Sequence, residues 1–196
     1  MSKKNTRTEI LKAAIVVFSE QGYEGVSMRN IANVVNISAP ALYNHFKDKQ
    51  SLYIAAITES FGNKSGLLLQ ALTGAAEPIV RLEQFVFQLC EVLHDDPEFR
   101  RLMQRELLDG DEKRLRYLAT EVFGLSFQKM MDLLTELKPD CDAHSLAVMI
   151  IGMIHKPFEL KPLVRFFPGS HSEHANPAYI TKQVMAILSA YLGDSK

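Results

Sequence analysis

The stretch that decides the fold of this chain reads Val26-Ser-Met-Arg-Asn-Ile-Ala-Asn-Val-Val-Asn-Ile-Ser-Ala-Pro-Ala-Leu-Tyr-Asn-His-Phe-Lys-Asp-Lys-Gln-Ser-Leu-Tyr53. Ser27 and Ser38 each precede a short run with helical spacing, and a serine there can cap the first turn of a helix. Val26 before the first serine and Ile31 after it have the spacing of a hydrophobic staple, and Ile37 and Leu42 stand in the same relation to the second serine. The stretch therefore predicts two helices of about two turns each.

The connection between these two helices is only Val35-Asn36-Ile37. Asn36 tolerates the left-handed backbone that such a tight turn requires. Pro40 fits the first turn of the second helix, where its missing N–H costs nothing, although Ala39 remains an alternative cap residue. One apolar inner face, packed against Phe18, is expected from Ile31, Ala32, Val35, Ile37, Leu42 and Phe46. Two short helices with this turn are typical of a helix-turn-helix, whose second helix fits the major groove of DNA.

The rest of the chain also has helical spacing, without the sustained alternation that strands show. The first helix should open at Thr6, with Glu9 completing a capping box, and stop at Gly22. We expect further helices over residues 48–74, 78–94, 97–109, 111–137, 142–154 and 177–192, with Pro157 kinking or ending the fifth of these and a loop over 161–176. The fold class is therefore all-α with about nine helices: a three-helix DNA-binding domain over residues 1–50, then a helical effector-binding and dimerisation domain over 51–196.

Composition and charge fit a DNA-binding protein with one basic end. The 196 residues are 47% hydrophobic and 23% charged, as in globular proteins. The first 50 residues hold seven basic and four acidic side chains, a net charge of +3, whereas the remainder carries −4. Two distant cysteines, no export leader and no apolar run long enough for a membrane span lead us to expect a cytoplasmic protein.

The elements of the first residues occur in a familiar order: Phe18 and Gly22-Tyr23, then Ser27-Met-Arg-Asn-Ile-Ala32, then Ser38-Ala-Pro-Ala-Leu-Tyr-Asn-His-Phe46, then Lys47-Asp-Lys-Gln-Ser-Leu52. With these elements the chain resembles the TetR family of transcription regulators over roughly its first sixty residues. Asn36 stands where that family more often has glycine. Beyond the head, no effector subclass is recognised.

The resemblance implies a homodimer with two heads, an effector pocket in the body, and an interface made by the last two helices. Family members usually repress, and they release DNA when a ligand binds. By position, the candidate DNA-binding residues are Tyr43, His45 and Lys49 on phosphates, Ala39, Pro40 and Asn44 on bases, Ser27 and Arg29 from the preceding helix, and Ser38 at the start of the recognition helix.

The body offers weaker candidates for a ligand site. Aromatic and methionine side chains recur there at helical spacing, and core packing is the simpler explanation for any one of them. His155, inside an apolar helix, is either a polar group of a pocket or a hydrogen-bonded structural histidine. The candidate ligand-binding residues are Met103, Phe123, Phe127 and His155, while Phe85 and Met130 share the same pattern.

Other function classes find less support. His171 and His174 resemble a metal pair but lack a third ligand nearby, and Cys141 with His144 is no stronger. No nucleophile, base and orienting group form a catalytic set, so we expect neither an enzyme nor a cofactor. Two alternatives stay open: a helical small-molecule-binding or scaffolding protein whose head no longer reads a specific site, and an enzyme built on the body. The preferred prediction is a ligand-responsive regulator that binds a palindromic operator.

Overall fold

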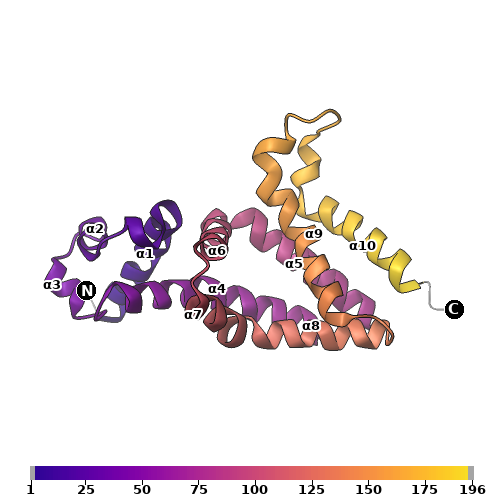
Figure 1. Ribbon diagram of the computed structural model, residues 1–196, viewed down its shortest axis with the longest axis horizontal. Helices are drawn as coiled ribbons and strands as arrows, with labels where there is room; N and C mark the ends of the chain where they lie inside the picture. Colours follow the sequence, from indigo (N-terminus) through magenta and orange to yellow (C-terminus); the bar gives the residue numbers. More distant parts are fainter. Residues whose placement is uncertain (1–2, 194–196) are drawn as a thin grey trace. The chain divides into compact units, whose positions relative to one another are not determined.

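The computed structural model describes residues 3–193, and the side chains from residue 6 onward. Within this range the chain forms ten α-helices, a π-helical turn and a 3-10 turn, and it contains no strand (Figure 1). The prediction of an all-α fold is confirmed, with one helix more than expected.

Two compact units make up the chain. The head unit comprises the residues up to Asn63 together with Pro97–Val122. The body unit comprises Lys64–Asp96 together with the chain from Phe123 onward. The boundary predicted after residue 50 lies within the head unit, near the start of a long helix that runs through both units. The division into a DNA-binding and an effector domain remains a prediction about function.

The head unit contains α1 (Lys3–Gly25), α2 (Met28–Val34), α3 (Ala39–Tyr43), the first part of α4 (Lys49–Thr73), α6 (Pro97–Asp109) and α7 (Glu112–Tyr117). The predicted start of α1 at Thr6 is wrong, because the helix has begun by Lys3. Lysine is a good helix former, so residues before the capping signal continue the helix instead of ending it. Gly22 does interrupt α1 as predicted, with a positive φ of 73°.

The helix predicted over residues 111–137 is broken into three. Asp111 caps α7, since its side chain accepts the backbone N–H of Arg114 at 2.9 Å. A π-helical turn, η1 (Leu118–Val122), follows, and α8 (Gly124–Leu137) begins after Phe123. Glycine weakens a continuous helix, and π-turns mark places where the regular hydrogen-bond ladder shifts.

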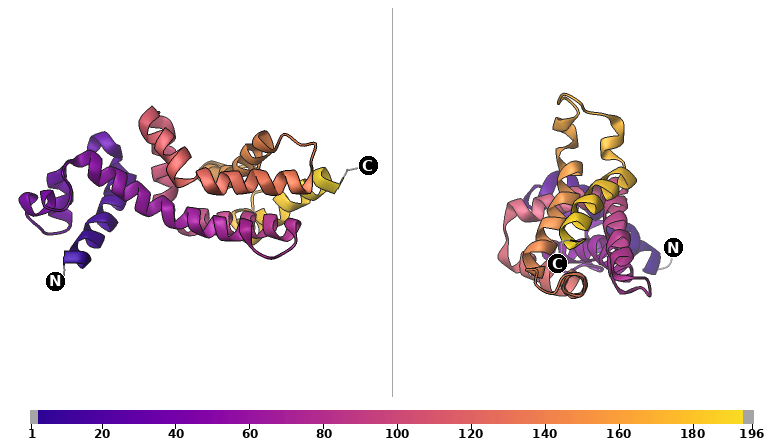
Figure 2. Two further views of the ribbon diagram at one scale, coloured as in Figure 1. Left: turned by 90° about the horizontal axis from the view of Figure 1, so that it is seen from below. Right: turned by 90° about the vertical axis from the view of Figure 1, so that its right-hand side faces the viewer.

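Prolines do not end α9 (Ala143–Val164), which runs through both Pro157 and Pro162. The predicted end near residue 154 is therefore wrong, and the loop that follows is shorter than residues 161–176. Each proline removes one helical hydrogen bond, but Ile154 and Phe158 on either side of Pro157 are buried and keep the helix in the core. The connection to α10 (Pro177–Gly193) contains η2 (Ser172–Ala175) and projects from the body unit (Figure 2).

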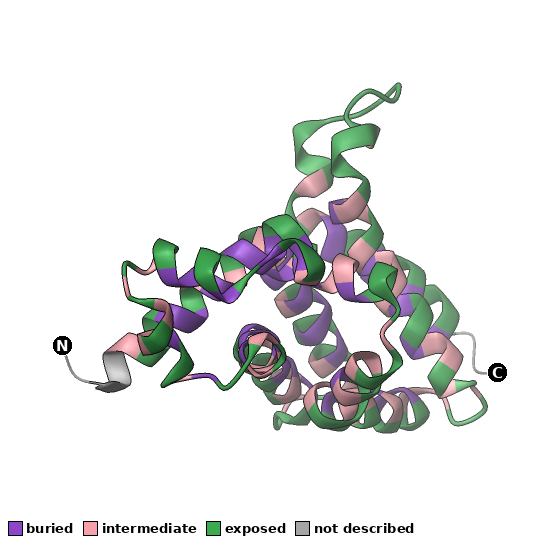
Figure 3. Ribbon diagram, turned by 60° about the vertical axis from the view of Figure 1, so that its left-hand side comes forward, coloured by how far each residue is buried: buried purple, intermediate pink, exposed green. Residues whose placement is uncertain are grey.

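The core of the body unit is formed by α5 (Pro78–Asp95), α8, α9 and α10, which pack against one another. Their buried residues recur at helical spacing and face inward, while the opposite faces are exposed (Figure 3). Phe85 and Met130 belong to this core, as their pattern favoured.

Candidate nucleic-acid interface

Two serine caps define the helix-turn-helix, as predicted. The Ser27 hydroxyl accepts the backbone N–H of Asn30 at 3.2 Å, and the Ser38 hydroxyl accepts that of Ala41 at 3.3 Å. Ser38, and not Ala39, is therefore the cap of α3. Asn36 adopts the left-handed conformation with φ of 54°, so the turn has the predicted geometry.

A rigid apolar base supports α3. Of the predicted inner face, Ile31, Ala32, Leu42 and Phe46 are buried together with Phe18, while Val35 and Ile37 are half-buried. The ring of Phe18 meets that of Tyr53 on α4 edge-on, with centroids 4.7 Å apart. The recognition helix is thus held by packing on its inner side, which leaves its outer side free for a ligand.

The outer side of α3 carries most of the predicted base-facing and phosphate-facing residues. Pro40, Tyr43 and Asn44 are exposed, and Ala39 and His45 are half-buried. The helix has five residues, shorter than the two turns predicted, so Asn44 and His45 lie just past its end. The chain still turns there, since the N–H of Asn44 donates to Pro40 at 3.2 Å.

Arg29 and Ser27 are exposed at the start of α2. The Ser27 hydroxyl, besides capping the helix, donates to the side chain of Asn30. A phosphate contact by the Ser27 hydroxyl would therefore compete with its hydrogen bond to Asn30. Arg29 takes no part in this cap, so a phosphate contact by its guanidinium would leave the cap intact.

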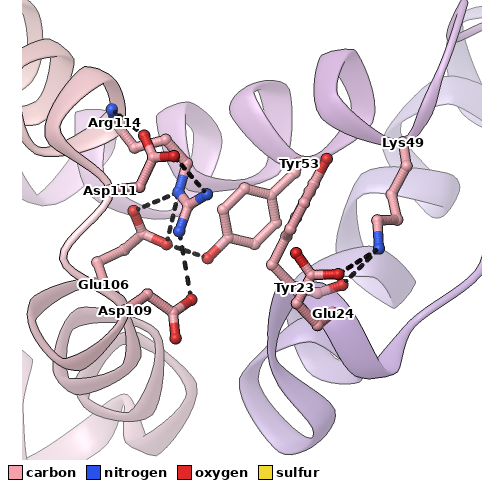
Figure 4. A network of polar contacts seen from close by, with 8 residues as sticks. All are labelled: Tyr23, Glu24, Lys49, Tyr53, Glu106, Asp109, Asp111 and Arg114. Atoms are coloured by element: carbon pink, nitrogen blue, oxygen red, sulfur yellow. Dashed lines mark hydrogen bonds and ion pairs between the residues drawn. The ribbon is translucent and has the colours of Figure 1, made fainter.

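The side chain of Lys49 has contacts within the head that the sequence did not predict. Its Nζ donates to the backbone carbonyl of Tyr23 at 2.8 Å and lies 4.2 Å from the centre of the Tyr23 ring (Figure 4). Glu24 lies 4.0 Å away, and the Lys49 side chain is 24% exposed. An ammonium group has three donors, so the contact with Tyr23 leaves two for a phosphate.

Tyr23 and Lys49 border a larger polar network that sequence reasoning missed (Figure 4). Its centre is Glu106 on α6, which is fully buried and accepts from the Tyr53 hydroxyl and from Arg114 Nε at 2.9 Å. The Arg114 guanidinium also lies 5.2 Å from the centre of the Tyr23 ring. Burial, reinforced by Glu106, raises the pKa of Tyr53, and burial with nearby Glu24 raises that of Tyr23.

Asp109 and Asp111 extend this network through Arg114, at 3.2 Å and 3.5 Å. Asp111 has two roles, since its side chain both caps α7 and pairs with Arg114. Burial opposes the charge of Arg114, but the hydrogen bond from its guanidinium to Glu106 raises the arginine pKa. No local signal in the sequence connects Glu106 to partners so far along the chain.

Arg7 is a second basic group that the sequence did not single out. Its guanidinium lies 5.1 Å from the centre of the Phe46 ring, and the residue is exposed. This contact brings the start of α1 to the end of the recognition segment, where a guanidinium can stack on an aromatic ring and still offer donors.

The four ligand candidates are all half-buried, but they do not share one compact unit. Met103 belongs to the head unit, whereas Phe123, Phe127 and His155 belong to the body unit. The Phe127 ring lies edge-on to that of His144, at 5.4 Å.

His155 is held within its own helix. Its Nδ1 lies 3.9 Å from Glu159 Oε1, one turn along α9. Burial lowers the pKa of His155, although Glu159 opposes that shift. The imidazole is therefore a mostly neutral group beside a carboxylate near neutral pH.

The His171–His174 pair is a local turn. The side chain of His174 accepts the backbone N–H of His171 at 3.3 Å, which is a capping contact in η2. In the described part of the chain, no three histidine, cysteine or acidic side chains come together as metal ligands do. Within the same range, every helix is too short or too polar to cross a bilayer.

About half of the chain matches known regulators in sequence. Residues 10–56 match the family described as bacterial regulatory proteins, tetR family. The chain is 32% identical over 103 residues to the HTH-type transcriptional repressor AcnR of Corynebacterium efficiens, which covers 49% of this chain and 55% of that protein. It is 33% identical over 82 residues to IcaR of Staphylococcus aureus, a negative transcriptional regulator of the biofilm operon icaADBC, covering 42% of this chain and 44% of that protein. The chain thus spans about half the length of the curated relatives it matches.

The fold matches solved structures over nearly the whole chain. A fatty acid degradation regulator FadR from Bacillus halodurans has a TM-score of 0.75 at 20% identity, covering 100% of this chain and 99% of that one. A transcriptional regulator from Pseudomonas aeruginosa has a TM-score of 0.79 at 17% identity, covering 100% and 94%. Matches at this identity show the fold alone.

The capped α2 and α3, the left-handed Asn36 between them and the sequence match over residues 10–56 all describe the same head. The helical fold matches that of a solved regulator over the full length of this chain. On these grounds residues 10–56 form a helix-turn-helix head of the tetR family of bacterial regulatory proteins.

Proposed function

We propose that this protein is a DNA-binding transcriptional repressor that binds a palindromic operator as a homodimer and releases it when a ligand binds. The observation that carries the proposal is α3, capped by Ser38, packed on a buried base and exposed at Tyr43 and Asn44. The names of AcnR and IcaR, which match about half of the chain in sequence, describe a repressor and a negative regulator. Such a role would be carried out in the cytoplasm and requires no catalytic group.

Two kinds of contact divide the proposed DNA surface. Tyr43, His45 and Lys49 would bind phosphates, which position the protein without reading the sequence. Asn44 can pair with an adenine edge, and Ala39 and Pro40 can meet a thymine methyl. Arg29 and Ser27 would add contacts from α2, and Ser38 would lie beside the DNA at the start of α3.

The test is selection of binding sites from a random duplex library with the full chain, followed by Asn44→Ala. We expect a palindrome whose half-sites lie about one helical turn apart, or a multiple of it. Asn44→Ala should relax the preference at one position of each half-site by about 1–3 kcal/mol. Asn63→Ala, exposed on α4, is the matched control and should keep the preference. A library that yields no enriched sequence with the folded protein would refute specific DNA binding.

The proposed dimer would form through α9 and α10. Within the body unit, α9 and α10 each expose large apolar side chains, which are Val148, Met149, Leu160, Leu163, Ile187 and Tyr191. Such an apolar surface is typical of an interaction site. Gly152 lies on α9, and apart from its neighbours and the backbone of its own helix a Cβ built there would meet no atom within 4 Å.

Since a Cβ fits at this position, Gly152→Leu should leave the protomer folded and weaken dimerisation and operator binding together. The matched control is Gly66→Leu on α4, where a Cβ also meets nothing within 4 Å. Sedimentation velocity measures the dimer fraction of both variants. An unchanged dimer in Gly152→Leu would exclude this interface.

Ligand release would depend on the body unit, where Phe127, Phe123 and His155 remain the candidate lining and Met103 is the candidate from α6. The probes are medium-chain and long-chain fatty acids and apolar aromatic compounds such as naphthalene. FadR of Bacillus halodurans, a fatty acid degradation regulator by its name, motivates the first class. A probe that binds should raise the melting temperature, and one that releases DNA should also lower operator affinity, both effects being reduced by Phe127→Ala.

A further inference from the structure

Arg105 on α6 holds the end of the regular part of α1. Its Nε donates to the carbonyl of Ser19 at 2.9 Å, and its Nη2 donates to the carbonyl of Glu20. Gly22 interrupts α1 just beyond, and the last carbonyls of a helix lack partners within it. The guanidinium therefore takes the place of a C-terminal cap, supplied from a distant part of the chain.

The absence of a side chain at Gly22 gives the Arg105 guanidinium space to reach the end of α1. A Cβ built there would come within 3.1 Å of Arg105 Nη1, and the positive φ of 73° also favours glycine. The interruption of α1 and the approach of Arg105 thus depend on the same residue.

Glu106, the next residue, holds α4. Its carboxylate is fully buried, accepts the Tyr53 hydroxyl, and pairs with Arg114 Nε at 2.9 Å and 3.2 Å. Arg114 in turn lies 5.2 Å from the Tyr23 ring, and Lys49 lies 4.2 Å from the same ring (Figure 4). A chain of contacts therefore connects α6 to a candidate phosphate-binding residue.

The apolar part of α6 has its own contacts with the head unit. Phe99 and Leu102 are buried, and the Phe99 ring meets that of Phe61 edge-on at 5.1 Å. Apolar contacts are not directional, and a buried ion pair adds little net stability compared with apolar groups of the same shape. Arg105 and Glu106 instead require one arrangement of the helices, since their side chains must reach fixed partners on α1, α4 and α7.

We infer that the adjacent residues Arg105 and Glu106 are positioning residues for DNA binding. Arg105 fixes the end of α1 and Glu106 fixes α4 and the Tyr23 turn, so the placement of α2 and α3 depends on α6. This inference rests on the proposed function, because positioning matters only if the head binds DNA.

The experiment compares two pairs of variants in the full chain. Arg105→Gln and Glu106→Gln remove one charge each from the network. Their controls, Arg101→Gln and Glu98→Gln, make the same charge changes on the same helix. The control residues form an ion pair at 3.0 Å whose side chains are 45% and 32% exposed.

Operator affinity is measured against salt concentration, at a temperature where all variants are folded. Both network variants should bind about tenfold more weakly, as expected when hydrogen bonds to a charged group are lost and the competent arrangement is less populated. The controls should stay within about twofold of the wild type. The salt dependence of Arg105→Gln should be unchanged, because no phosphate contact is removed.

Amide hydrogen exchange supplies a reading that does not need DNA. In Arg105→Gln, exchange should accelerate over residues 19–30, and in Glu106→Gln over residues 49–53, while α5 and α10 keep wild-type rates. A variant that only lowers global stability would accelerate all helices together.

Network variants that bind and exchange like their controls would overturn the inference, and so would weakened binding with unchanged exchange. If Arg105→Gln does not fold, Arg105→Lys keeps the charge with fewer directed donors, and wild-type behaviour in that variant would also overturn it. If the wild type binds no duplex, the proposed function fails, and the exchange rates alone decide whether the two residues position the head.

Discussion

Replacing Lys49 with methionine would separate two roles of one side chain. The variant keeps the length of the stem and removes the ammonium group. That group donates to the Tyr23 carbonyl at 2.8 Å and lies 4.2 Å from the Tyr23 ring. We expect Lys49→Met to lower both the stability of the protein and the salt dependence of operator binding.

The stability loss follows from the contacts. A hydrogen bond from a charged donor contributes about 1.5–3 kcal/mol, and a partly exposed cation–π contact about 0.5–1 kcal/mol. Glu24 is 94% exposed and lies 4.0 Å away, so that ion pair contributes nothing measurable. Since the Lys49 side chain is 24% exposed, water replaces part of the lost bond, and about 1–2 kcal/mol remains.

The effect on DNA follows from counterion release. Each phosphate contact that is lost should reduce the slope of log affinity against log salt by about 0.9. Urea denaturation measures the first quantity, and a salt titration against the operator and a scrambled duplex measures the second. Lys113→Met, exposed on α7, is the control for the change in net charge and should leave both nearly unchanged.

Two results would refute this reasoning. Unchanged stability would show that the contact with Tyr23 does not hold Lys49. A loss of stability with an unchanged salt slope would show that Lys49 supports the head without binding a phosphate.

Three further results are expected. Tyr53→Phe should destabilise the protein by about 1.5–3 kcal/mol in urea denaturation, because the buried carboxylate of Glu106 loses the hydrogen bond from the Tyr53 hydroxyl. An unchanged free energy of unfolding would contradict that hydrogen bond. Burial lowers the pKa of His155, so the unfolded chain binds protons more readily than the folded chain. The free energy of unfolding should therefore fall as pH drops below about 6.5, and it should fall less steeply in His155→Gln. Equal pH profiles of the two proteins would contradict the burial of His155. Burial raises the pKa of the Cys90 thiol to about 11, so iodoacetamide should modify Cys141 before Cys90. Mass spectrometry of the folded protein would detect the order of modification, and faster modification of Cys90 would contradict its burial.

Much of the head could be predicted because its signals are local. The caps at Ser27 and Ser38 bind N–H groups three residues ahead, and Asn36 adopts a conformation that its own side chain tolerates. Apolar spacing over one or two turns also identified the side of α3 that packs inward. Where a local rule competes with packing, it was less reliable: α9 continues through Pro157 because the residues beyond are buried.

The tertiary structure alone decided which distant side chains meet. Arg105 and Ser19 are 86 residues apart in the chain, Tyr53 and Glu106 are 53 apart, and Lys49 and Tyr23 are 26 apart. The spacing of a helix reports which residues share its face, but not which other helix covers that face or which carbonyl a guanidinium reaches. The sequence by itself therefore determined the all-helical class, the two capped helices of the head, the turn between them and the exposed side of α3. The partners of Lys49 and the buried position of Glu106 follow only from the packing of α6 and α7 with α1 and α4, since each such contact depends on the placement of two elements at once.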